Sequence, residues 1–63
     1  MIYYYFVSWY GDGRYGYSGI DSDRELVYYS DFEEVSKALR KRNNLKNDPI
    51  ILFYNLMLVE ETK

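Results

Sequence analysis

Cysteine and histidine are both absent from this chain of 63 residues, and proline occurs only once. Without them the chain forms no disulfide, no zinc site of the usual kinds, no thiol nucleophile and no histidine-based triad. A chain of about 60 residues buries only about 60% of the surface that its unfolded form exposes, so its stability is marginal unless something is added. With disulfides and common metal sites excluded, the sequence favours association with a second copy or with another protein.

Long hydrophobic runs are also missing. The two apolar stretches, residues 1–10 and 50–59, are about ten residues long, whereas a membrane-spanning helix needs about twenty. The first stretch has no basic region before it, as a secretory signal peptide would have. We therefore expect no membrane segment and a cytoplasmic location, because small secreted proteins more often contain disulfides.

The composition and turn residues predict two strands at the start of the chain. Residues 2–10 are rich in Tyr, Phe and Val, which favour strands, and they end at Gly11-Asp12-Gly13, where glycine permits the positive φ of a tight hairpin. A shorter second strand follows at residues 14–20. Because it contains Gly16 and Gly19, we expect it to be an edge strand or to carry a bulge.

A helix is predicted to follow. Ser30 and Glu33 have the spacing of a capping box, which predicts that the helix begins at Asp31. Asn43 or Asn44 can supply the left-handed residue that ends it. Its apolar stripe is Phe32, Val35, Ala38 and Leu39.

Residues 50–59 form the third predicted strand. A right-handed crossover from the second strand then places the third strand on the far side of the first. The sequence therefore predicts an α+β fold, a single ββαβ domain over residues 1–63. Its sheet is three-stranded and mainly antiparallel, in the order 2-1-3, with one helix on one face.

Both long strands are apolar on both faces. In residues 2–10 the even positions include Tyr4 and Phe6 and the odd ones Tyr5 and Trp9, and residues 50–59 show the same feature. One helix cannot cover both faces of a sheet, so we expect a homodimer, formed by faces or by edges, or a surface that binds a target. The alternative is that tyrosine hydroxyls keep one face hydrated.

Few residue patterns in the chain point to catalysis. Residues 11–16 fit the letters G-x-G-x-x-G but lie in a hairpin and not between a strand and a helix. The acidic run 21–25 has too few ligands for a calcium loop. Carboxylate pairs remain formally possible, yet a chain of this size has little room for a substrate pocket. We expect no enzymatic activity, no cofactor and no metal.

Charge is segregated along the chain. Residues 21–36 contain six acidic residues and one basic residue, whereas residues 37–46 contain five basic residues and no acidic one. Complementarity to the helix dipole accounts for much of this pattern. The alternative function is a nucleic-acid-binding module that combines tyrosines with the basic residues Lys37, Arg40, Lys41, Arg42 and Lys46. A sequence pI near 4.9 argues against it.

Aromatic and arginine side chains near the hairpin are the candidates for binding a partner protein, because such residues dominate interface energies. Alanine at Trp9 or Tyr15 is expected to abolish binding without unfolding the chain. The candidate partner-binding residues are Tyr5, Trp9, Arg14, Tyr15 and Tyr17.

Nearly the whole chain resembles a group of known small proteins. The segments that carry the resemblance are residues 3–8, the glycine-containing hairpin, the amphipathic segment 30–42 and the run 45–56. Together they resemble small strand-strand-helix-strand proteins of phages and mobile elements of Gram-positive bacteria, including anti-defence inhibitors of the type that blocks the Hachiman system. The resemblance implies a phage origin and a non-enzymatic inhibitor that acts in the host cytoplasm. Its target would be a bacterial defence or regulatory protein.

Overall fold

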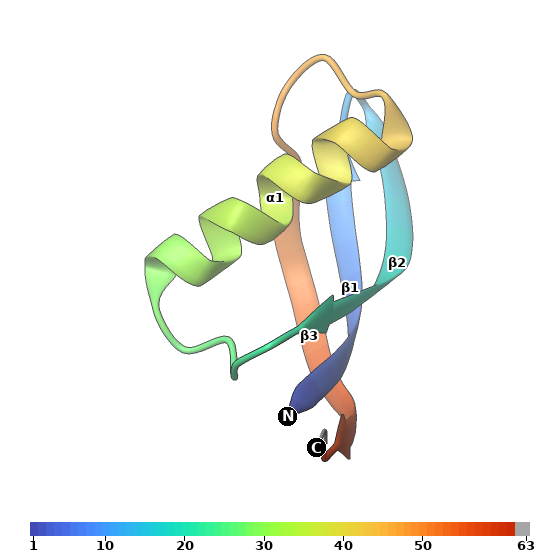
Figure 1. Ribbon diagram of the computed structural model, residues 1–63. Coiled ribbons are helices and arrows are strands. Elements are labelled where there is room, and N and C mark those ends of the chain that lie inside the picture. The colour runs from blue at the N-terminus through green and yellow to red at the C-terminus, as the bar shows by residue number, and fades with distance from the viewer. Residues whose placement is uncertain (62–63) are drawn as a thin grey trace.

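The computed structural model describes residues 1–61 of the chain. Its elements are β1 (Ile2–Gly11), β2 (Arg14–Ser22), α1 (Tyr29–Asn43) and β3 (Ile50–Glu60). The strands form one sheet in the order β2-β1-β3, and both neighbours of β1 are antiparallel to it. The helix crosses one face of this sheet diagonally (Figure 1). The predicted α+β class, ββαβ order and strand order are therefore confirmed.

The β1–β2 hairpin is closed by two residues. Gly11 pairs with Arg14, and between them Asp12 and Gly13 have φ values of 52° and 75°. Positive φ at both central residues is the geometry that Asp-Gly favours in tight hairpins. The Asp12 carboxylate also accepts the backbone N–H of Lys46 at 2.7 Å, which ties the hairpin to the loop after α1.

The helix begins two residues earlier than predicted, at Tyr29, and the expected Ser30–Glu33 box does not start it. Asp31 takes that role, because its carboxylate accepts the backbone N–H groups of Val27 and Tyr28 at 3.0 and 2.9 Å. A carboxylate can accept two amides at once, and at this end of a helix it also complements the dipole.

The far end of the helix behaves as predicted. Asn44 adopts the left-handed conformation with φ 55°, and the backbone N–H of Leu45 donates to the carbonyl of Arg40 at 2.9 Å. This pairing satisfies a carbonyl that the helix leaves unpaired.

The core identifies the face of the sheet that meets the helix. The odd-numbered side chains of β1 are buried against α1, the loop before it and the loop after it. The core consists of Tyr5, Val7, Trp9, Leu26, Val35, Leu39 and Leu45. Phe32 is partly buried beside it, whereas Ala38, which was expected in the same stripe, is exposed.

β2 is an edge strand, one of the two outcomes that its glycines predicted, and the register irregularities of the sheet lie in β3. The pairing of β1 with β3 shifts register twice, and each shift passes over one residue of β3, first Met57 and then Leu52. β2 pairs with β1 without a shift, as an edge strand. Gly16 lies against the indole ring of Trp9, so the absence of a side chain there leaves room for the ring.

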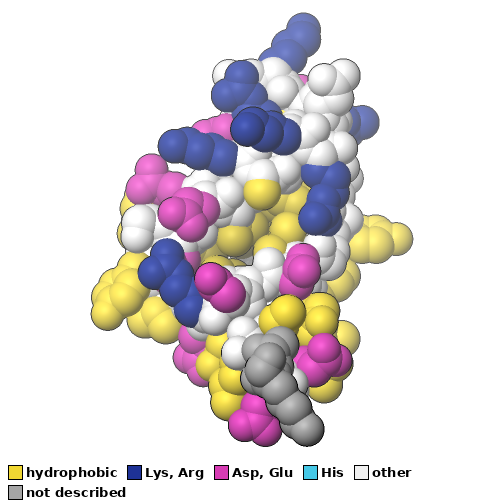
Figure 2. Space-filling view, in the orientation of Figure 1, with side chains coloured by type: hydrophobic (Ala, Val, Ile, Leu, Met, Phe, Trp, Pro, Cys, Tyr) yellow, Lys and Arg dark blue, Asp and Glu magenta, His cyan; other side chains and the backbone are white. Residues whose placement is uncertain are grey.

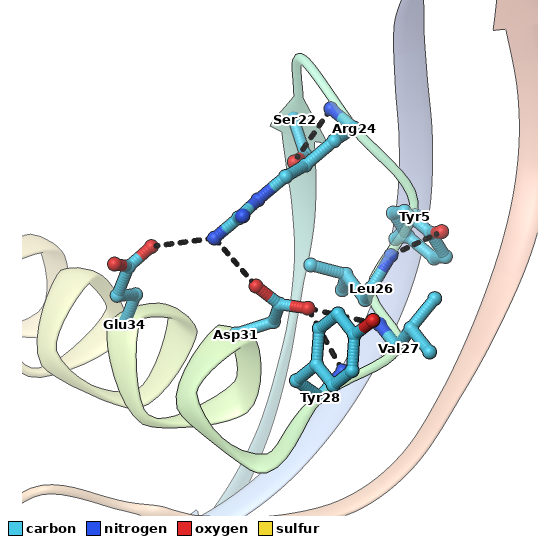
Figure 3. Close-up of polar contacts among 8 residues, drawn as sticks. All are labelled: Tyr5, Ser22, Arg24, Leu26, Val27, Tyr28, Asp31 and Glu34. Carbon is cyan, nitrogen blue, oxygen red and sulfur yellow. Dashed lines mark hydrogen bonds and ion pairs between the residues drawn. The ribbon is translucent and has the colours of Figure 1, made fainter.

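A polar cluster fixes the connection between β2 and α1 (Figure 3). The Tyr5 hydroxyl accepts the backbone N–H of Leu26 at 3.0 Å, and the Arg24 guanidinium pairs with the Asp31 carboxylate at 2.6 Å. Asp31 is buried, and its hydrogen bonds from the Val27 and Tyr28 amides, together with Arg24, lower its pKa from the ordinary 3.8 against the opposing effect of burial.

Replacing Asp31 with asparagine is expected to lower stability at neutral pH and to lower it less in acid. Because the folded-state pKa of Asp31 lies below 3.8, its ionised form contributes fully above that pH, and the contribution is lost as pH falls through the folded-state pKa. Thermal midpoints of wild type and Asp31→Asn between pH 7 and pH 2 measure this. The difference between the two thermal midpoints should be constant near neutral pH and should shrink below pH 3.8. A gap that does not change with pH would contradict this role.

The folded chain is elongated and exposes more surface than its mass requires. Its extents are 40 × 19 × 18 Å, and its radius of gyration is 11.7 Å, against about 10.6 Å for a compact domain of this length. Its accessible surface is 4815 Å², against about 4,300 Å² for a typical monomer of this mass. Within residues 1–61, α1 is too short and too polar to cross a membrane.

Candidate protein-binding surface

The side of the sheet opposite α1 carries a group of exposed apolar side chains, which we call the open face. The register places these residues together, because residues directly opposite in antiparallel strands share a face. The open face consists of Phe6 and Tyr10 of β1, Tyr15 and Tyr17 of β2, and Ile50, Phe53 and Leu58 of β3. In Figure 1 it is turned away from the viewer.

Four of these rings are arranged in two contacts between neighbouring strands. Phe6 stacks on Tyr17 with ring centroids 5.8 Å apart and an angle of 28° between the planes. Tyr10 and Tyr15 are 4.8 Å apart and tilted by 58°. Rings that already hold each other in place lose little conformational freedom when a partner covers them. The open face is therefore partly organised for binding before a partner arrives.

The end of the open face away from the hairpin is acidic. Tyr4 lies there with Asp21 opposite it on β2, and Glu60 lies nearby on β3. Partial burial raises the pKa of Tyr4 above 10.0, and the negative charges of Glu60 and Asp21 raise it further. The basic residues of α1 are on the other side of the sheet. A complementary partner surface would therefore be apolar with Lys or Arg at one border.

β3 is exposed on both of its faces. On the helix side Tyr54 contacts Phe32, with ring centroids 4.8 Å apart, and Tyr5, with centroids 6.1 Å apart, but it stays 45% exposed. Leu56 and Val59 on the same side are also exposed, because α1 crosses the other end of the strand (Figure 1). Residues 50–59 carry no charged side chain.

The structure separates the five candidate binding residues. Tyr5 and Trp9 are 4% and 3% exposed and belong to the core, so alanine at Trp9 is expected to unfold the chain, contrary to the sequence-based expectation. Arg14 is exposed and donates to the Asn43 carbonyl at 3.4 Å. Tyr15 and Tyr17, at 78% and 74% exposed, lie on the open face.

The sequence-based candidates did not include the other residues of the open face, which are Phe6, Tyr10, Ile50, Phe53 and Leu58. Alternation placed Phe6 and Tyr10 together but did not show which face the helix covers. The sequence does contain a signal for this. Gly16 and Ser18 lie opposite Trp9 and Val7, and small residues on that side leave room for large core side chains.

The basic residues do not join the tyrosines of the open face. Figure 2, drawn from the helix side, shows Lys and Arg side chains gathered toward the end of α1 that leads to β3. Two of the five candidates have partners within the chain. Arg40 pairs with Asp48 at 3.7 Å, and Arg42 donates to the carbonyl of Gly19 at 2.7 Å. The basic residues and the tyrosines of the open face therefore lie on opposite sides of the sheet.

A groove of about 370 Å³ lies between the first half of α1 and the start of β3. Phe32 and Ile51 form its apolar lining, and Glu33 and Asp48 are at its border. Within the described part of the chain, no three acidic side chains come together as ligands for a metal ion. The run 11–16 lies in the hairpin and the strand after it, where no helix N-terminus faces it.

Comparison with known proteins adds no relative. No protein-family model, no curated protein and no solved structure matches the chain.

Proposed function

We propose that this protein functions by binding another protein, without catalysis, through the open face of its sheet. The observation that carries the proposal is the exposure of seven large apolar side chains on one side of a sheet whose other side holds the core. Contiguous apolar surface of this kind marks interaction sites in proteins. Its aromatic content fits the residue types that contribute most to binding energy.

The resemblance described above gives this binding a biological setting. We propose that the bound protein is a bacterial defence or regulatory protein, that binding inhibits it, and that the chain is encoded by a phage. The acidic end formed by Asp21 and Glu60 adds that the target presents Lys or Arg beside an apolar surface.

Alanine at Tyr15 or at Tyr17 is expected to weaken target binding by about 30-fold, the loss typical of a residue at the centre of an interface. Both side chains are exposed, so these variants should keep the wild-type circular dichroism spectrum and thermal midpoint. Quantitative affinity capture from bacterial lysate, followed by mass spectrometry and by titration of the captured protein, measures the effect.

Tyr29→Ala is the matched control. Tyr29 is 82% exposed but lies at the start of α1, on the other side of the sheet. This variant should capture the same protein as wild type. Equal capture by wild type, Tyr17→Ala and Tyr29→Ala would contradict the proposal, and capture that disappears after nuclease treatment would support the nucleic-acid alternative.

The inhibitory role has a separate test. A phage plated on bacteria that carry the target's defence system should form plaques when wild-type protein is expressed and should not when Tyr17→Ala is expressed. Binding without any effect on plaque number would contradict inhibition but not binding.

A further inference from the structure

The outer edge of β3 differs in chemistry from the outer edge of β2. Both strands lie at ends of the sheet order, so the outward N–H and C=O groups of each lack a strand partner within residues 1–61. On β2, the Arg42 guanidinium donates to the Gly19 carbonyl, and Arg14 and Asp21 place charges on the strand. Residues 50–59 of β3 include no charged side chain. A long, uncharged, apolar edge is a template for pairing with another strand.

We propose that β3 pairs antiparallel with β3 of a second copy of this chain, about a two-fold axis at Asn55. Two three-stranded sheets then join into one six-stranded sheet. In this register Ile51 lies opposite Val59 of the second copy, and Tyr54 lies opposite Leu56. Asn55 lies opposite Asn55 of the second copy, and Glu60 lies at the end of the seam. Such a dimer is isologous and closes on itself.

The two sides of β3 support this register. Pairing with β1 assigns four residues of β3 to the helix side, namely Ile51, Tyr54, Leu56 and Val59. It assigns five to the open side, namely Ile50, Phe53, Asn55, Leu58 and Glu60. Directly opposed residues in an antiparallel pair share a face. With a two-fold axis at Asn55, residues on the helix side lie opposite residues on the helix side, and residues on the open side lie opposite residues on the open side. This holds for every opposed pair in which the β1 pairing assigns both residues to a side.

The two register shifts in β3 make this match possible. Leu52 and Met57, the residues that the β1 pairing passes over, lie almost symmetrically about Asn55. An axis at Leu56 would instead oppose Tyr54 to Leu58, which belong to opposite sides of the sheet.

An axis at Tyr54 also fits less well than one at Asn55. It would place Pro49, which has no N–H, opposite Val59 of the second copy. It would also bring Asp48 opposite Glu60, so that two carboxylates face each other at each end of the seam.

The chain exposes more surface than a typical monomer of its mass, as a chain that associates with a second copy would. The accessible surface of 4815 Å² exceeds that of a typical monomer by about 500 Å². A small specific interface buries about 1,200 Å² in total, or about 600 Å² from each partner.

The axis runs perpendicular to the sheet, so both helices lie on one side of the dimer and both open faces on the other. The dimer therefore places two copies of the open face next to each other. The inference does not depend on the proposed function, since it concerns the edge of β3 and requires no target.

Substitutions that introduce a charge at position 55 test the dimer and its register together. Wild type at tens of micromolar is expected to show twice the 7.7 kDa of one chain by light scattering during size exclusion. Asn55→Asp and Asn55→Lys, each alone, place like charges opposite each other and should shift the protein to 7.7 kDa. An equal mixture of the two variants should recover the double mass, because opposite charges then meet across the seam.

Asn47→Asp and Asn47→Lys are the matched controls. Asn47 is exposed in the loop before β3, so both variants should remain dimeric. Asn55 is exposed as well, and circular dichroism should show that its variants keep the fold. A wild type that stays at 7.7 kDa, or Asn55 variants that stay dimeric, would overturn the proposal.

Tyr17→Asp separates edge pairing from association through the open faces. Tyr17 lies on β2, at the far edge from the seam, and is exposed. Edge pairing predicts that Tyr17→Asp remains a dimer although it loses target binding. A monomeric Tyr17→Asp would overturn the β3 seam in favour of a dimer formed by the open faces.

Discussion

Leu39→Ala is expected to destabilise the protein by about 3–5 kcal/mol, the upper part of the range for removing a buried leucine side chain. Leu39 is 0% exposed and is one of the two most completely buried side chains, with Val7. A domain of this length has a total stability of roughly 3–9 kcal/mol. The substitution should therefore remove a large share of the free energy of unfolding, as urea titration followed by circular dichroism would show.

Leu52→Ala is the matched control for this substitution. It removes the same atoms, but Leu52 is 52% exposed. At a protein concentration too low for association, it is expected to cost less than about 1 kcal/mol. Similar losses in the two variants would mean that the core is not centred on α1 and the odd-numbered side chains of β1.

Gly16→Ala is expected to destabilise the protein by about 1–3 kcal/mol, the usual cost of overpacking a core. A Cβ at Gly16 would meet three atoms of the Trp9 indole, Cζ2, Cε2 and Cη2, at distances that real Cβ atoms do not adopt. The indole is 3% exposed and is packed within the core, so it has little freedom to move away. Urea titration gives the loss, and the near-ultraviolet circular dichroism of Trp9 should change with it.

Gly19→Ala separates this clash from the general effect of replacing a glycine. Gly19 lies on the same strand and a Cβ there would meet nothing within 4 Å. It should be neutral or slightly stabilising, because alanine restricts the unfolded chain more than glycine does. If Gly16→Ala were as mild as Gly19→Ala, Trp9 would not occupy the position described.

Much of the fold could be predicted from the sequence because local and global patterns agree. The turn at Asp12 and Gly13, the left-handed Asn44 and the apolar spacing of Val35 and Leu39 each specify local structure. The order of elements and the handedness of crossovers then leave few topologies. The start of α1 was misplaced because Asp31 accepts amides from outside the helix, in competition with the local Ser30–Glu33 pattern.

The candidate site was harder to predict because two apolar faces look alike in a strand. From the sequence alone, Tyr5 and Trp9 cannot be told apart from the exposed aromatic residues of the same strands. They are buried because α1 covers them and because the loop before α1 brings the backbone N–H of Leu26 to the Tyr5 hydroxyl. The two shifts in the β3 register are also invisible in a run of apolar residues. Only the pairing with β1 shows which β3 side chains lie on each side of the sheet.

These observations together describe a chain whose helix covers part of one face and whose apolar surface continues over the open face and the edge of β3. The tyrosines of the open face can be hydrated while the protein is free, because their hydroxyls bind water. The same rings supply a large apolar area when a partner covers them. The chain therefore works by association, with β3 as the seam between copies and the open face as the surface for a target.

Residue-resolved amide hydrogen exchange at low and high protein concentration tests this claim most directly. Along β3, the outward-facing amides should exchange rapidly in dilute solution and slowly in concentrated solution, because pairing with a second copy protects them. The outward-facing amides of β2 should exchange at the same rate in both. Exchange along β3 that does not depend on concentration, or protection that appears on β2 instead, would contradict the account.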